Sequence, residues 1–130
     1  MVTIKSHTDL EQSKKLAEIL PLDSADMEFM FLKENNSMVG RVPFVKDGYE
    51  EPDCGYNIVP CWSLAALISI LPQSVEFKGD KYYLRFMKEY VEYANDEISI
   101  TGIFLHTTGN DNLVDACYEM IIKLHELKML

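Results

Sequence analysis

The amino-acid sequence predicts an α+β fold, an antiparallel sheet of about four to five strands with helices at about residues 8–20, 60–71 and 112–128 packed on one face. Three observations lead to this prediction. Residues 112–128 repeat apolar side chains with the 3.6-residue period of an amphipathic helix. Residues 60–71 are apolar on nearly every side, which indicates a buried helix. The segments between the helices are rich in aromatic and β-branched residues, which favour strands.

The first helix is expected to begin at Thr8. Thr8 and Glu11, three residues later, fit a capping box, in which each side chain accepts a hydrogen bond from the other residue's backbone N–H. Asp9 lies in the first turn, where a negative charge is favoured by the helix dipole. Pro21 cannot continue a helix, so the helix is expected to end at about Leu20.

A pair of strands is expected next. Residues 27–32 are rich in strand-forming side chains, and the polar residues 35–37 are typical of a turn. Residues 38–45 can return as a second strand, and Pro43 places that strand at a sheet edge because proline has no N–H to donate. Residues 47–55, with two glycines, a proline and four acids, predict a loop.

The middle helix is predicted over residues 60–71. Pro60 is tolerated in the first turn because its missing N–H would have no partner there. The segment leaves no clearly polar side, so we expect a buried central helix. Its apolar residues are Leu64, Ala65, Ala66, Leu67, Ile68, Ile70 and Leu71.

Residues 81–94 fit two structures. Their apolar residues match the i, i+3, i+4, i+7 spacing of a helix, but the segment is also rich in aromatic and β-branched residues. We favour two or three antiparallel strands in the region 75–105, with one helix over residues 81–94 as the alternative. Residues 98–105 predict a strand, with Gly102 as a candidate bulge.

The last helix is expected to start at Asn112, with Asp115 in the position of the acidic residue of a capping box. Lys123 and Lys128 near its end suit the helix dipole. Its apolar face is formed by Leu113, Cys117, Met120, Ile121 and Leu124.

Length and composition predict a single domain over residues 1–130, because 48% hydrophobic and 25% charged residues are typical of a globular protein with one core. No apolar stretch is long enough to span a membrane, and the start of the chain lacks a signal-peptide pattern, so a cytoplasmic location is expected. The odd number of three cysteines agrees with reduced thiols. A net charge of −9 disfavours nucleic acid as a partner, because phosphates are bound mainly by lysine and arginine.

The sequence predicts no metal site and no cofactor. Its cysteines and histidines lack the spacing of metal ligands, and its glycines are isolated, so no phosphate-binding loop is present. The densest acidic cluster, Glu50, Glu51 and Asp53, is expected to be a solvated loop. No pattern indicates a particular small molecule.

One arrangement for catalysis is a thiol with a base. Cys61, early in the predicted middle helix, lies where the helix dipole could lower the thiol pKa. His106 at the end of a predicted strand could act as the base, with Asp111 orienting the imidazole. Nothing in the sequence brings these residues together, so no enzymatic activity is predicted.

An aromatic group is the remaining candidate for function. On a sheet, about half of these side chains would face outward, as tyrosines do at protein-binding surfaces. The predicted interaction surface consists of Tyr82, Tyr83, Arg85, Tyr90 and Tyr93.

Two segments resemble a known group of proteins. Residues 60–72, PCWSLAALISILP, and residues 112–126, NLVDACYEMIIKLHE, are similar to segments of small uncharacterised proteins from gut bacteria of the Bacteroides type and from their phages and prophages. Those proteins share an apolar helix ending in Leu-Pro, a short tyrosine-rich β region and a final helix that begins with Val-Asp-Ala. The resemblance covers about the last half of the chain. It favours strands for residues 82–93 and implies no catalytic residues.

These observations lead to three hypotheses about function. The first is a non-enzymatic cytoplasmic protein of phage or prophage origin that acts through protein–protein contacts or self-association. The second is an acidic inhibitor that mimics nucleic acid and occupies the basic groove of a host enzyme. The third is a hydrolase or transferase that uses Cys61 and His106.

Overall fold

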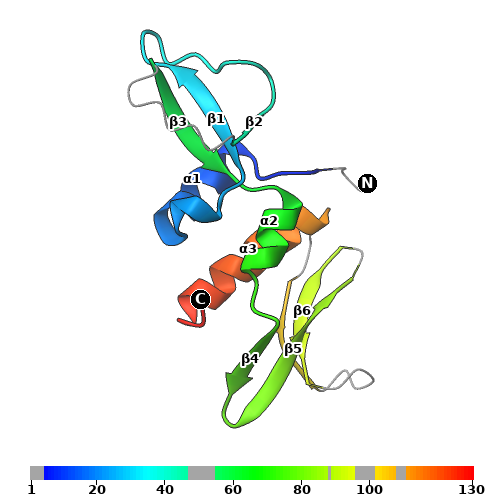
Figure 1. The fold of residues 1–130 in the computed structure, drawn as a ribbon. Helices are drawn as coiled ribbons and strands as arrows, with labels where there is room; N and C mark the ends of the chain where they lie inside the picture. The colour runs from blue at the N-terminus through cyan, green and yellow to red at the C-terminus, as the bar shows by residue number, and fades with distance from the viewer. Residues whose placement is uncertain (1–4, 47–54, 88, 96–101, 108–110) are drawn as a thin grey trace. The chain divides into compact units, whose positions relative to one another are not determined.

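A computed structural model of the chain describes residues 5–46, 55–87, 89–95, 102–107 and 111–130 (Figure 1). Within these residues it contains three α-helices, one short 3₁₀ helix at Leu22–Ser24, and two antiparallel sheets of three and four strands. The predicted α+β class is confirmed. The strands are divided between two sheets, whereas the sequence predicts one sheet of four to five strands.

The chain forms two compact units. The N-terminal unit comprises His7–Ala66, and the C-terminal unit comprises Met1–Ser6 together with Leu67–Leu130. Lys5 therefore belongs to the C-terminal unit, where its ammonium lies 2.8 Å from the Asp115 carboxylate. A single domain over residues 1–130 stays a prediction.

Helix α1 spans Leu10–Ile19 in the N-terminal unit, and its cap is shifted by one residue from the predicted one. Asp9, not Thr8, is the N-cap: the Gln12 N–H donates to the Asp9 carboxylate at 2.8 Å, and the Asp9 N–H donates to the Gln12 side chain at 3.1 Å. Thr8 is instead fully buried, and its hydroxyl accepts a hydrogen bond from the Trp62 N–H. The predicted start at Thr8 is wrong because the adjacent aspartate is a better N-cap than threonine, while the end at Leu20 is confirmed.

The three-stranded sheet has β1 (Met27–Leu32) at its centre, between β2 (Phe44–Val45) and β3 (Tyr56–Cys61) (Figure 1). The predicted return strand at 38–45 is reduced to β2 and a single bridge at Met38, but its place at the sheet edge is confirmed. The main partner of β1 is β3, which the sequence analysis missed. Pro60 is accommodated in β3 because β3 is also an edge strand.

Helix α2 spans Leu64–Ile70 and is shorter than the predicted helix at 60–71. Ser63 stands before it, and its hydroxyl accepts a hydrogen bond from the Ala66 N–H at 3.1 Å, so the helix begins after a cap that the prediction placed inside it. The expectation of a helix buried on all sides is also wrong. Ile68 is 37% exposed, and Ala65 and Ser69 are exposed with it.

The C-terminal unit contains a four-stranded antiparallel sheet in chain order. Its strands are β4 (Ser74–Phe77), β5 (Asp80–Phe86), β6 (Val91–Ala94) and β7 (Ile103–His106). The antiparallel strands favoured for the region 75–105 are therefore confirmed, although there are four instead of two or three, and the alternative helix over residues 81–94 is wrong.

Turn chemistry explains why these residues form strands. Lys78 and Gly79, the two residues between β4 and β5, both have positive φ, as in a tight type I′ hairpin. The predicted bulge at Gly102 is wrong. The register of β6 with β7 skips Phe104, which is the extra residue, and Gly102 lies before β7. The part of the predicted strand at 98–101 lies outside the described residues.

Helix α3 spans Leu113–Glu126, with Asn112 as its N-cap, so the predicted start is confirmed. Four residues of the predicted apolar face are buried, but Leu113 is only half-buried, and Val114 and Ala116 are buried instead. It packs against β6. The core of the C-terminal unit is formed by the buried face of α3 and by Val91 and Tyr93 of β6. Its fully buried side chains include Val91, Tyr93, Val114, Cys117, Met120, Ile121 and Leu124.

A membrane-spanning helix is not found in the described part of the chain, where no helix has both the length and the hydropathy that crossing a bilayer requires.

Candidate functional site

The five residues of the predicted interaction surface do not share one surface. Tyr93 is fully buried, and its hydroxyl donates a hydrogen bond to the Pro72 carbonyl oxygen at 2.7 Å. Burial raises the Tyr93 pKa well above its ordinary value. The assignment of Tyr93 to a surface is therefore corrected, because this side chain belongs to the core.

The other tyrosines lie on different sides of the sheet. Cross-strand partners share a face, and successive residues of a strand alternate between faces. Tyr83 and Arg85 are therefore on one face, and Tyr82 is on the opposite one. Tyr83 is 53% exposed, whereas the Tyr82 ring is half-buried and stacks on Phe104 at 4.9 Å between centroids. Of the five predicted residues, only Tyr83 is exposed.

Arg85 and Tyr90 both contact other side chains of the C-terminal unit. The Arg85 Nε donates to the Glu92 carboxylate at 2.8 Å, and Glu92 is only 3% exposed. The Tyr90 ring lies 4.6 Å from the His106 ring. The guanidinium of Arg85 thus compensates a buried carboxylate, which is a structural role that limits its use in binding.

Cys61 is placed differently from the sequence prediction. It is the last residue of β3 and precedes α2, so it does not lie within the first turn of that helix as predicted. The thiol is fully buried and donates a hydrogen bond to the Thr8 carbonyl oxygen at 3.4 Å. Burial raises the Cys61 pKa, which opposes formation of the nucleophilic thiolate.

The proposed partners of Cys61 lie in the other unit. His106 is the last residue of β7, as predicted, and its backbone carbonyl oxygen accepts a hydrogen bond from the Lys123 ammonium at 2.8 Å. Asp111 is exposed. The structure therefore does not bring Cys61, His106 and Asp111 together within one unit. The acidic cluster at residues 50–53 lies outside the described residues, and so does Cys54.

Metal ligands are not gathered in the described ranges, where no group of three or more His, Cys, Asp or Glu side chains could hold an ion.

The second described thiol, Cys117, leads to a prediction about alkaline stability. Burial raises its pKa from 9.0 to about 12. Because the unfolded chain releases this proton first, the contribution of Cys117 is complete below pH 9 and is lost as the pH rises toward 12, by up to about 4 kcal/mol. Urea unfolding at pH 8 to 11 should show a steeper loss of stability for the wild type than for Cys117→Ala. Equal slopes for the two proteins would contradict the prediction.

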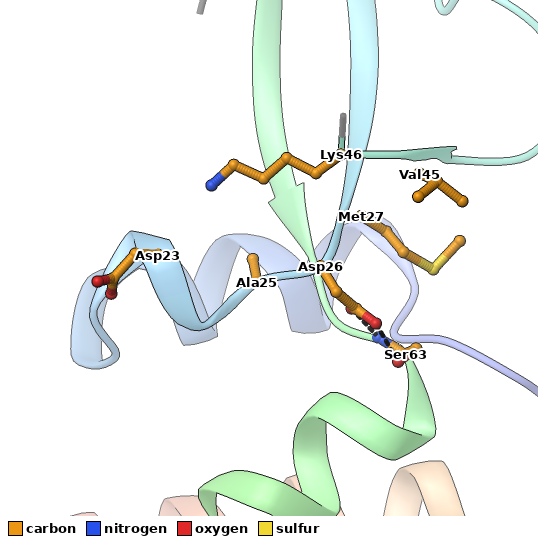
Figure 2. A pocket seen from close by; sticks show the side chains of 7 residues that line it. All are labelled: Asp23, Ala25, Asp26, Met27, Val45, Lys46 and Ser63. Carbon is orange, nitrogen blue, oxygen red and sulfur yellow. Dashed lines mark hydrogen bonds between the residues drawn. The ribbon is translucent and has the colours of Figure 1, made fainter. Parts of the chain in front are cut away.

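A shallow hollow of about 500 Å³ lies in the N-terminal unit beside β2. Figure 2 shows that the Asp26 carboxylate reaches Ser63, whereas Asp23 and Lys46 extend away from that pair. Asp26 accepts hydrogen bonds from the Ser63 N–H, at 2.8 Å, and from the Ser63 hydroxyl. Since Ser63 in turn caps α2, these two polar groups hold the start of the helix and do not form a reactive pair. The lining residues are Asp23, Ala25, Asp26, Met27, Val45, Lys46 and Ser63.

The three-stranded sheet has one face that α1 covers. The register pairs Met27 with Cys61 and Phe29 with Val59, so these four residues share a face. The Cys61 thiol is bonded to Thr8 beside the start of α1, Phe29 is 6% exposed, and α1 packs against β3. This is the inner face of the sheet.

The opposite face, which we call the outer sheet face, is unusual in its chemistry. An antiparallel sheet covered on one side normally turns polar side chains to water on the other. Here Ile58 is 46% exposed and Phe44 is 41% exposed, and the other members are half-buried. Six of its members are apolar or aromatic and one is acidic. The outer sheet face consists of Glu28, Met30, Leu32, Phe44, Tyr56, Ile58 and Pro60.

Such a face is a candidate interaction site, because exposed apolar patches on globular proteins often mark surfaces that contact other molecules. A signal for it was present in the sequence. Residues 27–32 read Met-Glu-Phe-Met-Phe-Leu, so both alternating sets of side chains are apolar apart from Glu28, as in a strand covered on both faces. The face depends on β3, which supplies three of its members, and the sequence predicts no strand there: residues 56–59 have no predicted structure, and Pro60 lies in the helix predicted at 60–71.

The structure thus defines an α+β protein whose candidate site is a largely apolar face of a sheet. Comparison of the chain with protein-family models, with curated proteins and with solved structures gives no match.

Proposed function

We propose that this chain is a non-enzymatic protein that acts through protein–protein contacts, and that the outer sheet face is its contact surface. The observation that carries the proposal is the exposure of Ile58 and Phe44 on a face with a single charged residue. Fully burying an exposed side chain of this kind contributes about 1.5–3 kcal/mol, and because Ile58 and Phe44 are 46% and 41% exposed, covering them would contribute roughly half of that each. The buried, high-pKa thiol of Cys61 supports a role without nucleophilic catalysis.

The cellular setting belongs to the same proposal. We place the protein in the cytoplasm of a gut bacterium of the Bacteroides type, with a phage or prophage origin, on the resemblance of residues 60–72 and 112–126. The second hypothesis is that the chain mimics nucleic acid, which needs carboxylates that are free to contact a basic groove. Four of the described carboxylates give it no support, because they are bonded within the chain. Asp9, Asp26, Asp115 and Glu92 have hydrogen bonds or ion pairs within the chain.

The proposal predicts that Ile58→Lys abolishes the protein's contacts without unfolding it, because a charge on the outer sheet face prevents apolar burial. Wild type and variant would be used for affinity capture from cytoplasm of such a bacterium, and their masses in solution compared by light scattering. Ile68→Lys is the matched control, since Ile68 is also exposed but lies on α2.

We expect a captured protein, or an oligomer, with the wild type and with Ile68→Lys but not with Ile58→Lys. The proposal would be refuted if the wild type and both variants were monomeric and captured the same proteins.

A further inference from the structure

The edge of the three-stranded sheet at β3 presents backbone groups that β1 does not use. β3 is the last strand of the sheet on this side, and its register continues to Gly55, whose carbonyl oxygen accepts a hydrogen bond from the Lys33 N–H at 3.1 Å. Backbone groups of an antiparallel strand alternate between its two sides, so every second residue from Gly55 bonds to β1. The residues between them direct their backbone groups away from β1. They are Tyr56, Ile58 and Pro60.

Two further observations agree with this alternation. Pro60 has no N–H, and its position on the outward side means that no bond to β1 is lost. Trp62 continues the outward series, and its carbonyl oxygen accepts a hydrogen bond from the Thr8 N–H at 2.9 Å. The chain itself therefore occupies the edge at Trp62. The open part of the edge runs from Tyr56 to Pro60, where no described residue accepts a hydrogen bond from the N–H of Tyr56 or Ile58.

The open edge is accessible and uncharged. Asn57 and Ile58 lie on opposite faces of the sheet and are both exposed, so neither face is covered at the middle of β3. Figure 1 shows α1 near the end of β3 that Cys61 occupies. Natural edge strands are commonly protected by a charge or by being very short. β2 has only two residues, whereas β3 has six, none of them charged, and Pro60 is its single protecting residue.

The backbone pattern of the open edge is complementary to itself. When a second β3 lies antiparallel with Ile58 on a two-fold axis, each Ile58 N–H donates to the Ile58 carbonyl oxygen of the other copy. Each Tyr56 N–H then donates to the Pro60 carbonyl oxygen of the other copy. Both donors of each open edge obtain an acceptor, and Pro60 supplies only the carbonyl group that it has.

The length of the open edge limits what can occupy it. A longer extended segment would meet Thr8, which already holds the edge at Trp62. A second β3 avoids this contact because its chain bends at Gly55, which has a positive φ of 79° and no side chain. The open stretch therefore suits a short strand that turns away after Tyr56, and β3 of a second copy has this form.

Charge and packing permit the same arrangement. The Glu28 carboxylates of the two copies would be separated by at least three inter-strand spacings, about 14 Å, which exceeds the screening length of about 8 Å at physiological salt. The net charge of −9 on each chain is therefore not concentrated at the contact. Antiparallel pairing also places the two Cys61 ends, and with them the two copies of α1, at opposite ends of the paired strands.

Resting on the proposed function, we infer that two copies of this chain associate through their β3 edges, antiparallel and centred on Ile58, to form one continuous sheet across a two-fold axis. Ile58 then lies beside the partner's Ile58 on the outer sheet face. Both copies of α1 lie on the opposite side of the joined sheet.

The first test compares Ile58→Pro with Ile58→Ala by sedimentation equilibrium. Both variants lose the isoleucine side chain, but only Ile58→Pro also loses the N–H that points away from β1, and it leaves the bonds to β1 in place. We expect a wild-type mass of twice the 15.0 kDa of one chain. Ile58→Pro should weaken the dimer about tenfold or more relative to Ile58→Ala. Circular dichroism checks that both variants keep the fold.

The second test does not depend on the folding of the proline variant. Residues in a hydrogen-bonded antiparallel pair have Cα atoms about 5.5 Å apart, within the range of about 4.4–6.8 Å that a disulfide spans. Ile58→Cys should therefore give a disulfide-linked dimer under mild oxidation. Phe44→Cys and Ile68→Cys, at positions 41% and 37% exposed on β2 and α2, are the matched controls and should remain largely unlinked, as should the wild type.

Three results would overturn the inference: a monomeric wild type at millimolar concentration, equal dimer affinity of Ile58→Pro and Ile58→Ala, or a dimer that is linked through Phe44→Cys and not through Ile58→Cys. The last result would make the outer sheet faces the contact between copies and would leave the proposed function intact. A monomeric wild type that captures another protein, with capture lost in Ile58→Lys, would also leave it intact. If Ile58→Lys changes neither self-association nor capture, the proposed function fails as well.

Discussion

Replacing Leu124 by alanine is expected to lower the free energy of unfolding by about 2–5 kcal/mol, because it removes a large side chain from a packed core and leaves a cavity. Leu124 is fully buried on α3. Urea unfolding followed by circular dichroism measures the change. The matched control is Leu127→Ala, at the end of the same helix, where the side chain is 48% exposed and the expected change is within about 0.5 kcal/mol. Equal effects of the two substitutions would contradict the buried position of Leu124.

The same variant tests whether the chain is one domain. Trp62 is the only tryptophan, is fully buried in the N-terminal unit, and donates a hydrogen bond from its indole N–H to the Ser24 hydroxyl at 3.0 Å. Its fluorescence therefore reports the unfolding of that unit. The predicted single domain requires Leu124→Ala to shift the fluorescence transition as far as the circular dichroism transition. A fluorescence transition that keeps its wild-type midpoint would show that the two units unfold independently.

Replacing Arg85 by alanine is expected to destabilise the protein by about 2–4 kcal/mol. The substitution leaves the Glu92 carboxylate buried at 3% exposure without the guanidinium that is bonded to it. The expected loss is below that of a fully buried pair because the Arg85 side chain is itself 31% exposed. Thermal or urea unfolding gives the value.

Two controls separate the loss of the ion pair from the loss of a side chain. Lys81→Ala removes a cation from the same face of β5, where Lys81 is exposed, and should cost no more than about 0.5 kcal/mol. The double variant Arg85→Leu with Glu92→Leu should be more stable than Arg85→Ala, because no unpaired charge remains buried. If Arg85→Ala and Lys81→Ala behave alike, the ion pair contributes little to stability.

The sequence was most informative where local signals and burial agreed. Asn112 caps α3, and the apolar period of that helix matches its buried side, so propensity, capping and packing all indicated one structure. The strands β5 and β6 were only partly predictable, since residues 81–94 fit the period of a helix as well, and the aromatic residues together with the turn residues Lys78-Gly79 favoured strands. Local patterns such as these depend on neighbours within a few residues.

The three-stranded sheet was harder to predict because it depends on contacts between distant residues. The apolar run from Pro60 fits a helix by composition, yet pairing with β1 holds Pro60 and Cys61 in a strand, and Ser63 then starts a shorter helix. The outer sheet face depends on that register. Its members come from three strands, and no local period relates Phe44 or Ile58 to Glu28.

The order of the two units along the chain has a consequence for synthesis on the ribosome. All of the N-terminal unit has been translated once Ala66 is added, so it can fold while the rest of the chain is still being made. Lys5 leaves the ribosome before any of that unit, yet its carboxylate partner, Asp115, emerges only after the whole of that unit. Lys5 can therefore form this ion pair only after α3 has been synthesised, and the C-terminal unit is completed only then.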